Sequence, residues 1–425
     1  MDSVSTFLTT IPVEFVIFAA TLAGVALLHR HTLAVALTGL AATVIYRLAV
    51  TGFAHGAGLE GLIAHAGHEW VILANLLLLL LGFALLANQF ELSNIPEAMP
   101  RWLPDNWTGG LALLAMVFVL SAFLDNIAGA VIGGVVARHV YHGKVSLGFV
   151  VSIVAAANAG GAGSVIGDTT TTMMWISGVP PVAVLHAFVA SGVAFAIFGV
   201  LGALQQHRHA PIQAHVAADT PPIDHARTVI VLVILATLIA VNFVGNAWFP
   251  EQQDAAPWLG LGLWAAILLT APVRAPQWRL LPEAAGGALF LVALVATASL
   301  MPVDRLPAAS WQSALGLGFL SAVFDNIPLT ALALKQGGYD WGVLAFAVGF
   351  GGSMIWFGSS AGVAISGLYP EARSVFAWVR HGWYVPVAYV AGFAALVLLL
   401  GWHPAPTRGE PAVVPAQSSV QQSGV

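Results

Sequence analysis

SAFLDNIAGAVIGG at residues 121–134 and NAGGAGSVIGDTTTTMMWI at residues 158–176 are the two stretches that decide the fold of this chain. Each places one aspartate, Asp125 or Asp168, in otherwise apolar sequence, beside Gly, Asn or Thr residues at which a membrane helix can break. A charge at the centre of a bilayer costs at least about 2.5 kcal/mol, and residues of this kind usually mark an ion or proton pathway. An ion pathway is therefore the first hypothesis.

The same pattern returns in the second half of the chain. SAVFDNI at residues 321–327 is identical to SAFLDNI at residues 121–127 at five of seven positions. Further on, GGSMIWFGS at residues 351–359 corresponds to GGAGSVIGD at residues 160–168, with serine in place of the final aspartate. Duplicated halves with interrupted hydrophobic segments at matching positions point to the binding site of a transporter.

Composition indicates a membrane protein. Hydrophobic residues make up 59% of the 425 residues and charged residues only 8%, which excludes an ordinary soluble domain. At roughly 20 residues per crossing, there is room for about ten to twelve spans in the lipid bilayer. The chain has no cysteine, which excludes disulfides, thiolate metal sites and cysteine nucleophiles. The formal net charge of −5 is small and scattered, so no nucleic-acid partner is expected.

Hydrophobic runs follow the same order in both halves: three spans, an Asp-Asn segment, a glycine-broken segment and a final span. We expect a first transmembrane repeat at 1–204, a polar linker at 205–227, a second repeat at 228–402 and a disordered tail at 403–425. Residues 54–69 are predicted to form a short interfacial helix. His65 and His68 share a helical face there, but we assign no metal to them.

The placement of basic residues bears on topology, because cytoplasmic loops are rich in Lys and Arg. If both Asp-Asn segments are re-entrant hairpins, ten of the 14 basic residues share one side and the halves have opposite orientation. If both segments cross fully, the split is nine to five and the halves are parallel. The rule favours hairpins by a small margin. In the hairpin arrangement, the four residues on the opposite side are Arg47, Arg305, Lys335 and Arg408.

Oxygen-bearing side chains dominate the motifs, and no Lys or Arg lies near the motif centres. Carboxylate, amide and hydroxyl oxygens are the hard ligands that a Na⁺-like cation prefers to nitrogen or sulfur, so no transition metal is expected. An anion site would need the opposite charge balance. The candidate cation and proton ligands are Asp125, Asn126, Asn158, Asp168, Thr169, Thr170 and Thr171 in the first half, and Asp325, Asn326, Thr330, Ser359 and Ser360 in the second.

A buried carboxyl group that is either protonated or loaded with a cation would exchange protons for cations, because burial disfavours an empty, charged group. We assign this exchange to Asp168 and Asp325, with Asp125 as a symmetric partner. A second role is compatible with the first. Asp125 and Asp325 also suit the N-cap positions of half-helices, where aspartate is a preferred residue.

Together with SAVFDNIPLTA at 321–331 and GGSMIWFGSSAGVAISG at 351–367, the motif at 158–176 resembles NhaD-type sodium/proton antiporters. These belong to the ion transporter superfamily that also holds citrate, dicarboxylate and arsenite carriers. The resemblance implies an all-α polytopic membrane protein of two inverted repeats, each with a re-entrant hairpin and a broken transmembrane helix. It implies ion-site roles for Asp125, Asn158, Asp168, Thr170, Asp325, Ser359 and Ser360.

The function expected from this resemblance is exchange of Na⁺, or a similar monovalent cation, for H⁺. The expected location is the bacterial inner membrane, as a multi-pass protein without a cofactor other than the transported ions. Because homodimers are common in the superfamily, the resemblance also implies a homodimer.

Two other classes of function are weighed. An organic-anion carrier for citrate or a dicarboxylate belongs to the same superfamily, but its paired Ser-Asn-Thr motifs are not found in this sequence. An intramembrane aspartyl protease also uses two buried aspartates. Its signature requires glycine at the position of Val165, and the one Tyr-Asp pair, Tyr339-Asp340, falls in a predicted loop. We therefore expect a transporter and not an enzyme.

Overall fold

A computed structural model describes residues 11–28, 31–53, 56–98, 103–212, 222–249, 252 and 255–405 of the chain. Most of these residues are helical, and the single β-contact found among them is an isolated bridge between Phe53 and Gly56. Residues 213–221 of the predicted linker and residues 406–425 of the predicted disordered tail lie outside the described residues. The fold is all-α, as predicted.

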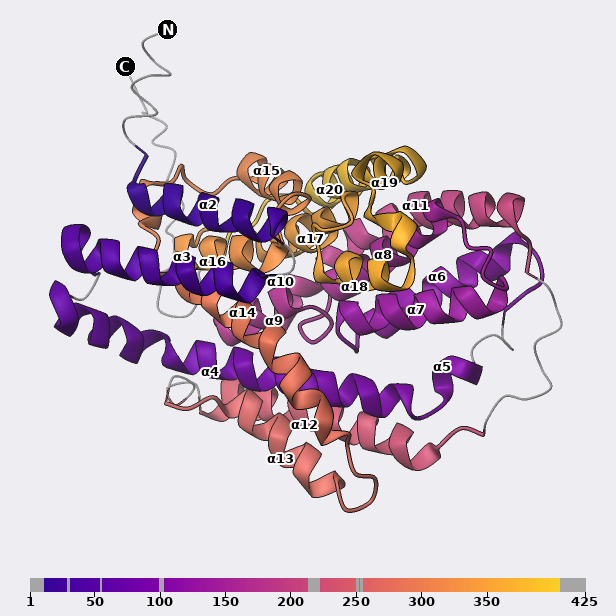
Figure 1. Ribbon diagram of the computed structural model, residues 1–425, viewed down its shortest axis with the longest axis horizontal. Coiled ribbons are helices and arrows are strands. Elements are labelled where there is room, and N and C mark those ends of the chain that lie inside the picture. Colours follow the sequence, from indigo (N-terminus) through magenta and orange to yellow (C-terminus); the bar gives the residue numbers. More distant parts are fainter. Residues whose placement is uncertain are drawn as a thin grey trace, which may run out of the picture.

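The first three long helices of each half form what we call the flanking bundle (Figure 1). The long helix α4 packs against α13 and α14, and α14 also packs against α3, so helices of the two halves alternate in this bundle. Its members are α2 (Val13–Leu27), α3 (Thr32–Tyr46), α4 (Gly58–Glu91), α12 (His225–Trp248), α13 (Trp258–Thr270) and α14 (Leu281–Ser299).

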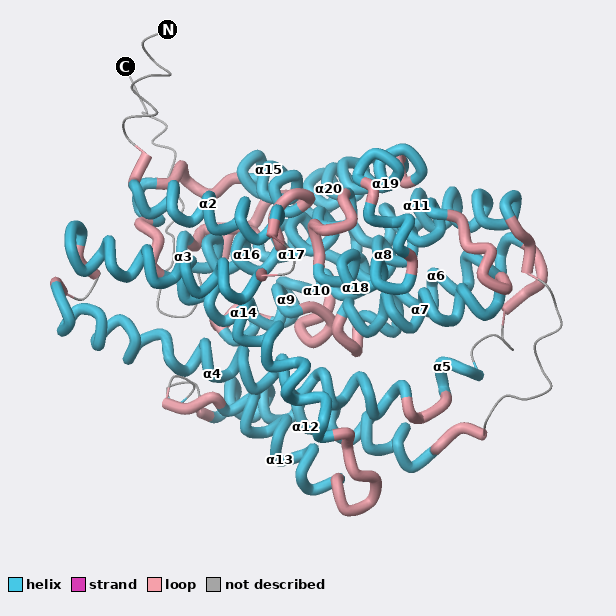
Figure 2. Tube along the Cα trace, in the orientation of Figure 1, coloured by secondary structure: helices cyan, strands magenta, loops and turns pink. Residues whose placement is uncertain are grey.

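The repeated motifs form the second group of helices, which we call the motif bundle (Figures 1 and 2). Both halves contribute the same order of elements, as the hydrophobic runs predicted. From the first half come α6 (Trp107–Ser121), α7 (Asn126–Val140), α8 (Leu147–Ala162), α9 (Thr169–Ile176), α10 (Pro181–Leu185) and α11 (Ala187–His209). From the second come α15 (Trp311–Ser321), α16 (Asn326–Gln336), α17 (Trp341–Gly351), α18 (Ser360–Leu368), α19 (Val375–His381) and α20 (Tyr384–Leu400).

The prediction of a short interfacial helix at 54–69 is wrong. Residues from Gly58 onward belong to α4, one continuous helix of 34 residues, which at 1.5 Å per residue is about 51 Å long. This length exceeds a hydrocarbon core of about 30 Å, so one unbroken helix can include both a spanning stretch and the polar first turns. His65 lies in these turns, and its Nε2 is 3.1 Å from the Ser299 hydroxyl at the end of α14.

Five helices in the described part of the chain are long and apolar enough to cross a bilayer, or six if the pair α19 and α20, bent by 63°, counts as one span. The Asp-Asn segments are different. Helices α6 and α7 have 15 residues each, about 22 Å, which is shorter than the hydrocarbon core. They lie side by side, joined by a tip at residues 122–125 (Figure 1), so the first Asp-Asn segment has the shape of a hairpin rather than of one long span. We call this pair hairpin 1. The corresponding pair of the second half, α15 with α16, is named hairpin 2 after its matching sequence, although its helices pack mainly on other elements, α15 on α17 and α16 on α14.

Each half has one broken helix, α8 with α9 in the first half and α17 with α18 in the second. Glycines allow these helices to cross the hairpins so closely that backbone atoms are in contact. A side chain at Gly160 would collide with the carbonyl oxygen of Phe118 in hairpin 1, and one at Gly351 would collide with that of Gly318 in hairpin 2. The following glycines, Gly161 and Gly352, also correspond to each other. A Cβ at Gly161 would lie 2.7 Å from the carbonyl oxygen of Gly167, and one at Gly352 would lie 2.6 Å from that of Gly358. The repeated glycines in the sequence therefore correspond to the same backbone crossing made twice.

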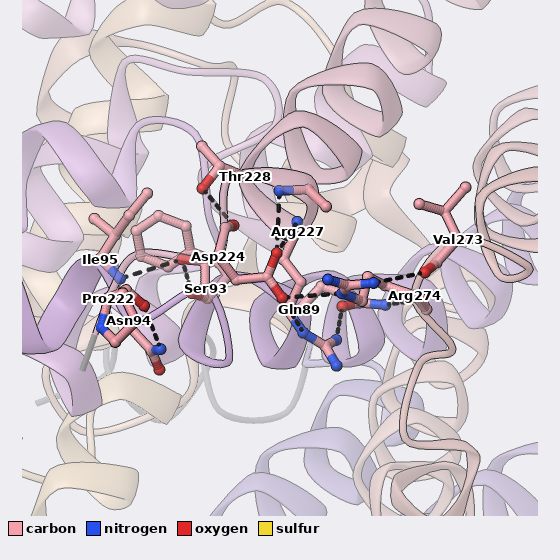
Figure 3. A network of polar contacts seen from close by, with 12 residues as sticks. Gln89, Ser93, Asn94, Ile95, Pro222, Asp224, Arg227, Thr228, Val273 and Arg274 are labelled. Atoms are coloured by element: carbon pink, nitrogen blue, oxygen red, sulfur yellow. Dashed lines mark hydrogen bonds and ion pairs between the residues drawn. The ribbon is translucent and has the colours of Figure 1, made fainter.

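A polar network near the start of α12 joins the two halves (Figure 3). Asp224 caps α12 by accepting from the backbone N–H groups of Ala226 and Arg227 at 3.0 and 3.2 Å. Its other carboxylate oxygen accepts from Arg274 Nε at 3.0 Å, and this bond lowers the pKa of Asp224. The backbone N–H of Asp224 donates to Ser93, just beyond α4, at 2.9 Å. The network thus fixes α12 and the segment after α13 to the end of α4.

Candidate functional site

The N-termini of four half-helices carry the polar residues of the motifs. Asp168 caps α9 by accepting from Thr170 N–H at 3.1 Å, and Asp325 caps α16 by accepting from Ile327 N–H at 3.0 Å. Ser359 caps α18, whereas Asp125 at the N-cap of α7 has the backbone N–H groups of Asn126 and Ile127 nearby but makes no capping bond of ordinary geometry. The partial positive charge at a helix N-terminus stabilises a nearby carboxylate. Of the two hairpin aspartates weighed for a capping role, Asp325 makes the capping bond of ordinary geometry, and Asp125 occupies the same position with a looser approach to the backbone N–H groups.

One group of these residues surrounds the start of α9, and we call it the α9 centre: Asp168, Thr170, Asp125 and Asn326. The Asp168 side chain is only 2% exposed, and the Asn326 amide of hairpin 2 donates to its Oδ2 at 3.4 Å. The Asp125 and Asp325 carboxylates both lie close enough to Asp168 to act on it electrostatically. Among the described residues, the buried Asp125 Oδ1 and Thr170 Oγ1 make no hydrogen bond of ordinary geometry, although the Thr170 hydroxyl lies near the Asp168 carboxylate. Such atoms are rare in folded proteins and need an explanation.

The second group surrounds the start of α18, and we call it the α18 centre: Ser359, Ser360, Asp325, Asn158, Ser353 and Asn126. Asn126 of hairpin 1 donates to the side-chain oxygen of Asn158 at 3.1 Å. The amide nitrogen of Asn158 in turn donates to the hydroxyls of Ser353 and Ser359 at 2.9 and 3.0 Å. Ser360 donates to Asp325 Oδ2 at 3.2 Å. Every one of these hydrogen bonds joins two side chains of the motif bundle.

The two centres bring together the aspartates and asparagines that the sequence singled out, but not all of the hydroxyls. Thr171 donates to the carbonyls of Ser164 and Asp168 at 2.5 and 2.9 Å, which braces the break between α8 and α9. Thr330 donates to the carbonyl of Asn326, one turn back in its own helix, at 2.9 Å. Thr169 is 9% exposed and follows Asp168 directly. Sequence reasoning missed Ser353, although it lies in the second glycine motif.

The charges around the two centres are acidic. The two ion pairs found in the described part of the chain both involve Asp224, far from the motifs in sequence. Lys335 in hairpin 2 donates instead to the carbonyls of Ser299 and Met301 in and just after α14, the latter at 2.7 Å. No group of three or more His, Asp or Glu side chains among the described residues is arranged to hold a metal ion.

Asp340, the aspartate relevant to the protease alternative, has a structural role. Its Oδ1 accepts from the backbone N–H groups of Gly342 and Val343 at 3.1 Å each, and its Oδ2 accepts from His403 N–H at 2.8 Å. It caps α17 and holds the segment after α20 against it. No second aspartate of the motifs contacts it through a hydrogen bond in the described residues.

Apolar helices of spanning length, hairpins and a buried acidic site define an all-α polytopic membrane protein. No family model matches the chain. Sodium/proton antiporter 2 of Arabidopsis thaliana is 30% identical over 304 residues, which cover 60% of this chain and 68% of that protein. The Na⁺/H⁺ antiporter NhaD of Vibrio parahaemolyticus is 27% identical over 390 residues, 79% of this chain and 91% of that protein.

Sodium/proton antiporter 1 of Arabidopsis thaliana is also similar, at 29% identity over 352 residues, although the chain spans only 58% of the length of that relative. These matches extend well beyond the quoted motifs. The chain therefore belongs to the sodium/proton antiporter family, as its resemblance to NhaD proteins predicted. The relatives do not favour the organic-anion alternative.

Proposed function

We propose that the protein exchanges Na⁺, or a similar monovalent cation, for H⁺ across the membrane, and that the exchange takes place at the α9 centre. One observation carries the proposal. Asp168 is buried, the Asp125 carboxylate is close enough to act on it electrostatically, and the buried Asp125 Oδ1 and Thr170 Oγ1 make no hydrogen bond of ordinary geometry among the described residues. Oxygen atoms left unpaired in a common acidic site are what a bound cation would satisfy.

The exchange follows from the cost of an unpaired buried charge. Isolated charges in an apolar interior are strongly disfavoured unless they are neutralised or paired. At the α9 centre this can be achieved by protons on the carboxylates or by a cation shared between them. Both ligands use the same oxygen atoms, so binding of one displaces the other. The site is stable when it holds protons or when it holds a cation, but not when it is empty. It therefore couples the outward movement of one ion to the inward movement of the other.

The four residues of the α9 centre have distinct roles in this proposal. Asp168 and Asp125 supply negative charge, Thr170 supplies a neutral oxygen, and Asn326 orients the Asp168 carboxylate through its amide N–H. Five further expected ligands, Asn126, Asn158, Ser359, Ser360 and Asp325, lie in the α18 centre. We place the cation at the α9 centre because Asp168 and Asp125 bring two carboxylates there, whereas Asp325 is the one carboxylate of the α18 centre.

The arrangement in the membrane is also proposed. The short arms of hairpin 1 and the distribution of basic residues support re-entrant hairpins and halves of opposite orientation. The similarity to bacterial NhaD proteins supports a location in the bacterial inner membrane. The homodimer expected from the superfamily remains part of the proposal.

The test uses proteoliposomes with an acidic interior and a pH-sensitive dye. NaCl, LiCl, KCl or sodium citrate is added outside, and the internal pH is recorded. Na⁺ or Li⁺ chloride is expected to raise the internal pH in the wild type but not in Asp168→Asn. Asp105→Asn, the same substitution at an exposed aspartate, is the matched control and should behave as the wild type. A response to citrate but not to the chlorides, or full activity of Asp168→Asn, would contradict the proposal.

A further inference from the structure

The duplication allows the two centres to be compared position by position. Ser359 caps α18 where Asp168 caps α9, and in the same alignment Asn158 corresponds to Gly349 and Ser353 to Ala162. The matching backbone contacts of Gly160 and Gly351 support this alignment independently of the side chains. Differences between the centres at these three positions are therefore substitutions within one shared architecture.

The residues at all three positions differ in chemistry between the two centres. In the α18 centre, Asn158, Ser353 and Ser359 form a closed, neutral group in which the amide nitrogen donates to both hydroxyls. In the α9 centre the same positions hold Gly349, Ala162 and Asp168, which leaves one carboxylate and no amide or hydroxyl. A Cβ at Gly349 would lie 3.2 Å from the Ala162 side chain and 3.4 Å from Asp168 Oδ2, so the glycine keeps this side of the carboxylate clear.

The hairpin asparagines show the consequence of this exchange. Asn126 reaches α18 only through Asn158, because its amide donates to the Asn158 oxygen. Asn326, its counterpart in hairpin 2, has no such intermediate and donates directly to Asp168. The Asn158 amide N–H₂ group donates to two acceptors. It carries no net charge, but its hydrogens are positively polarised and lie where several oxygen atoms converge.

We infer that the Asn158 amide takes the place of a second cation, so that only the α9 centre binds a transported cation. This rests on the proposed function and refines it. Asn158 is a positioning residue in this scheme: it satisfies Ser353, Ser359 and Asn126 permanently and keeps the α18 centre neutral apart from the capped Asp325. The α9 centre retains two carboxylates and unpaired oxygens, so only this centre requires a bound cation.

Counting bound cations tests the inference. Equilibrium dialysis of the purified full-length protein with ²²Na⁺ should give one Na⁺ per chain at saturation, with a Hill coefficient near 1 for Na⁺-driven proton movement. Asn158→Asp keeps the shape of the side chain but replaces the N–H₂ donor with an oxygen. This variant should bind two Na⁺ per chain and show a Hill coefficient above 1. Asn106→Asp, at the exposed N-cap of α6, is the matched control and should still bind one.

Other outcomes would overturn the inference. Two Na⁺ bound by the wild type would mean that the α18 centre holds a cation despite Asn158. One Na⁺ in Asn158→Asp, bound more tightly than in the wild type, would make Asn158 a direct ligand of a single shared cation. If Asn158→Asp does not fold, the triple variant Asn158→Gly, Ser353→Ala and Ser359→Asp copies the α9 pattern and should bind two. No Na⁺ binding and no Na⁺-driven proton movement by the wild type would contradict the proposed function itself, and the inference with it.

Discussion

The amide of Asn326 lies 3.4 Å from the carboxylate of Asp168, across a sequence separation of 158 residues. Hairpin 2 of the second half thus meets the broken helix of the first half. Hairpin 1 makes the reciprocal approach, with Asn126 reaching Ser359 of the second half through Asn158. The two halves are interlocked at the site, so neither half forms its polar centre without the other.

Asn326→Ala should weaken cation binding without abolishing transport. The substitution removes the donor that orients Asp168 while leaving both carboxylates in place. We expect the Na⁺ concentration for half-maximal dye response to rise about tenfold, equivalent to about 1.4 kcal/mol. Thr330→Val is the companion variant, because the Thr330 hydroxyl donates to the backbone of its own helix. Equal half-saturation in Asn326→Ala and the wild type would show that Asn326 does not act on Asp168.

Thr170→Val should separate stability from binding. The Thr170 hydroxyl is buried and makes no hydrogen bond of ordinary geometry among the described residues, and such a group costs about 1–3 kcal/mol when left unpaired. The variant, measured without Na⁺, should therefore be as stable as the wild type or more stable to thermal unfolding in detergent. Its half-saturating Na⁺ concentration should rise. A variant that loses stability while keeping its Na⁺ response would assign Thr170 to packing.

Gly160→Ala and Gly351→Ala should both destabilise the protein. In each, the new methyl group would collide with a backbone carbonyl of a hairpin, and backbone atoms cannot move aside as a side-chain end can. Overpacking of this kind costs about 1–3 kcal/mol or more. Gly192→Ala in α11 is the control, since no atom lies within 4 Å of its added Cβ. Thermal unfolding in detergent, or the yield of folded protein, distinguishes the three. Equal stability of all three variants would show that the close crossings are not required.

The network around Asp224 should make stability depend on pH in the acid range. The hydrogen bond from Arg274 lowers the pKa of Asp224 in the folded protein. A group with a depressed folded-state pKa contributes stability above its unfolded value, about 3.9 for aspartate, and loses it as the pH falls through the folded value. Melting temperatures between pH 7 and pH 3 should therefore fall less steeply at the acid end in Asp224→Asn than in the wild type. Parallel curves would show that this carboxylate is not coupled to folding.

Much of the fold could be predicted from the sequence. The apolar composition, the order of spans and the repeated Asp-Asn and glycine motifs predicted an all-α membrane protein with two matching halves, and the elements have that order. The prediction failed at 54–69, where polar residues were taken to end a helix. Polarity alone does not break a helix, and these turns belong to α4 because nothing in their backbone chemistry stops it.

The candidate site was predicted as a set of residues but not as a geometry. The sequence by itself determined which oxygen-bearing side chains lie in apolar surroundings, because a polar residue in a membrane segment stands out from its neighbours. It could not show that Asp325 makes a closer capping bond than Asp125, or that Thr171 braces a backbone break. Nor did it reveal Ser353 as a partner of Asn158.

Only the tertiary structure decided these points. Hydrogen bonds between residues about 160 to 200 positions apart depend on how the hairpins cross the broken helices, and that crossing is set by backbone contacts at glycines such as Gly160 and Gly351. The sequence determined that the two halves have the same order of elements and motifs. The packing of those halves determined that Asn158 fills the α18 centre while Gly349 leaves the α9 centre clear. The reason is that the distance between side chains of different halves is fixed by the fold and not by their spacing along the chain.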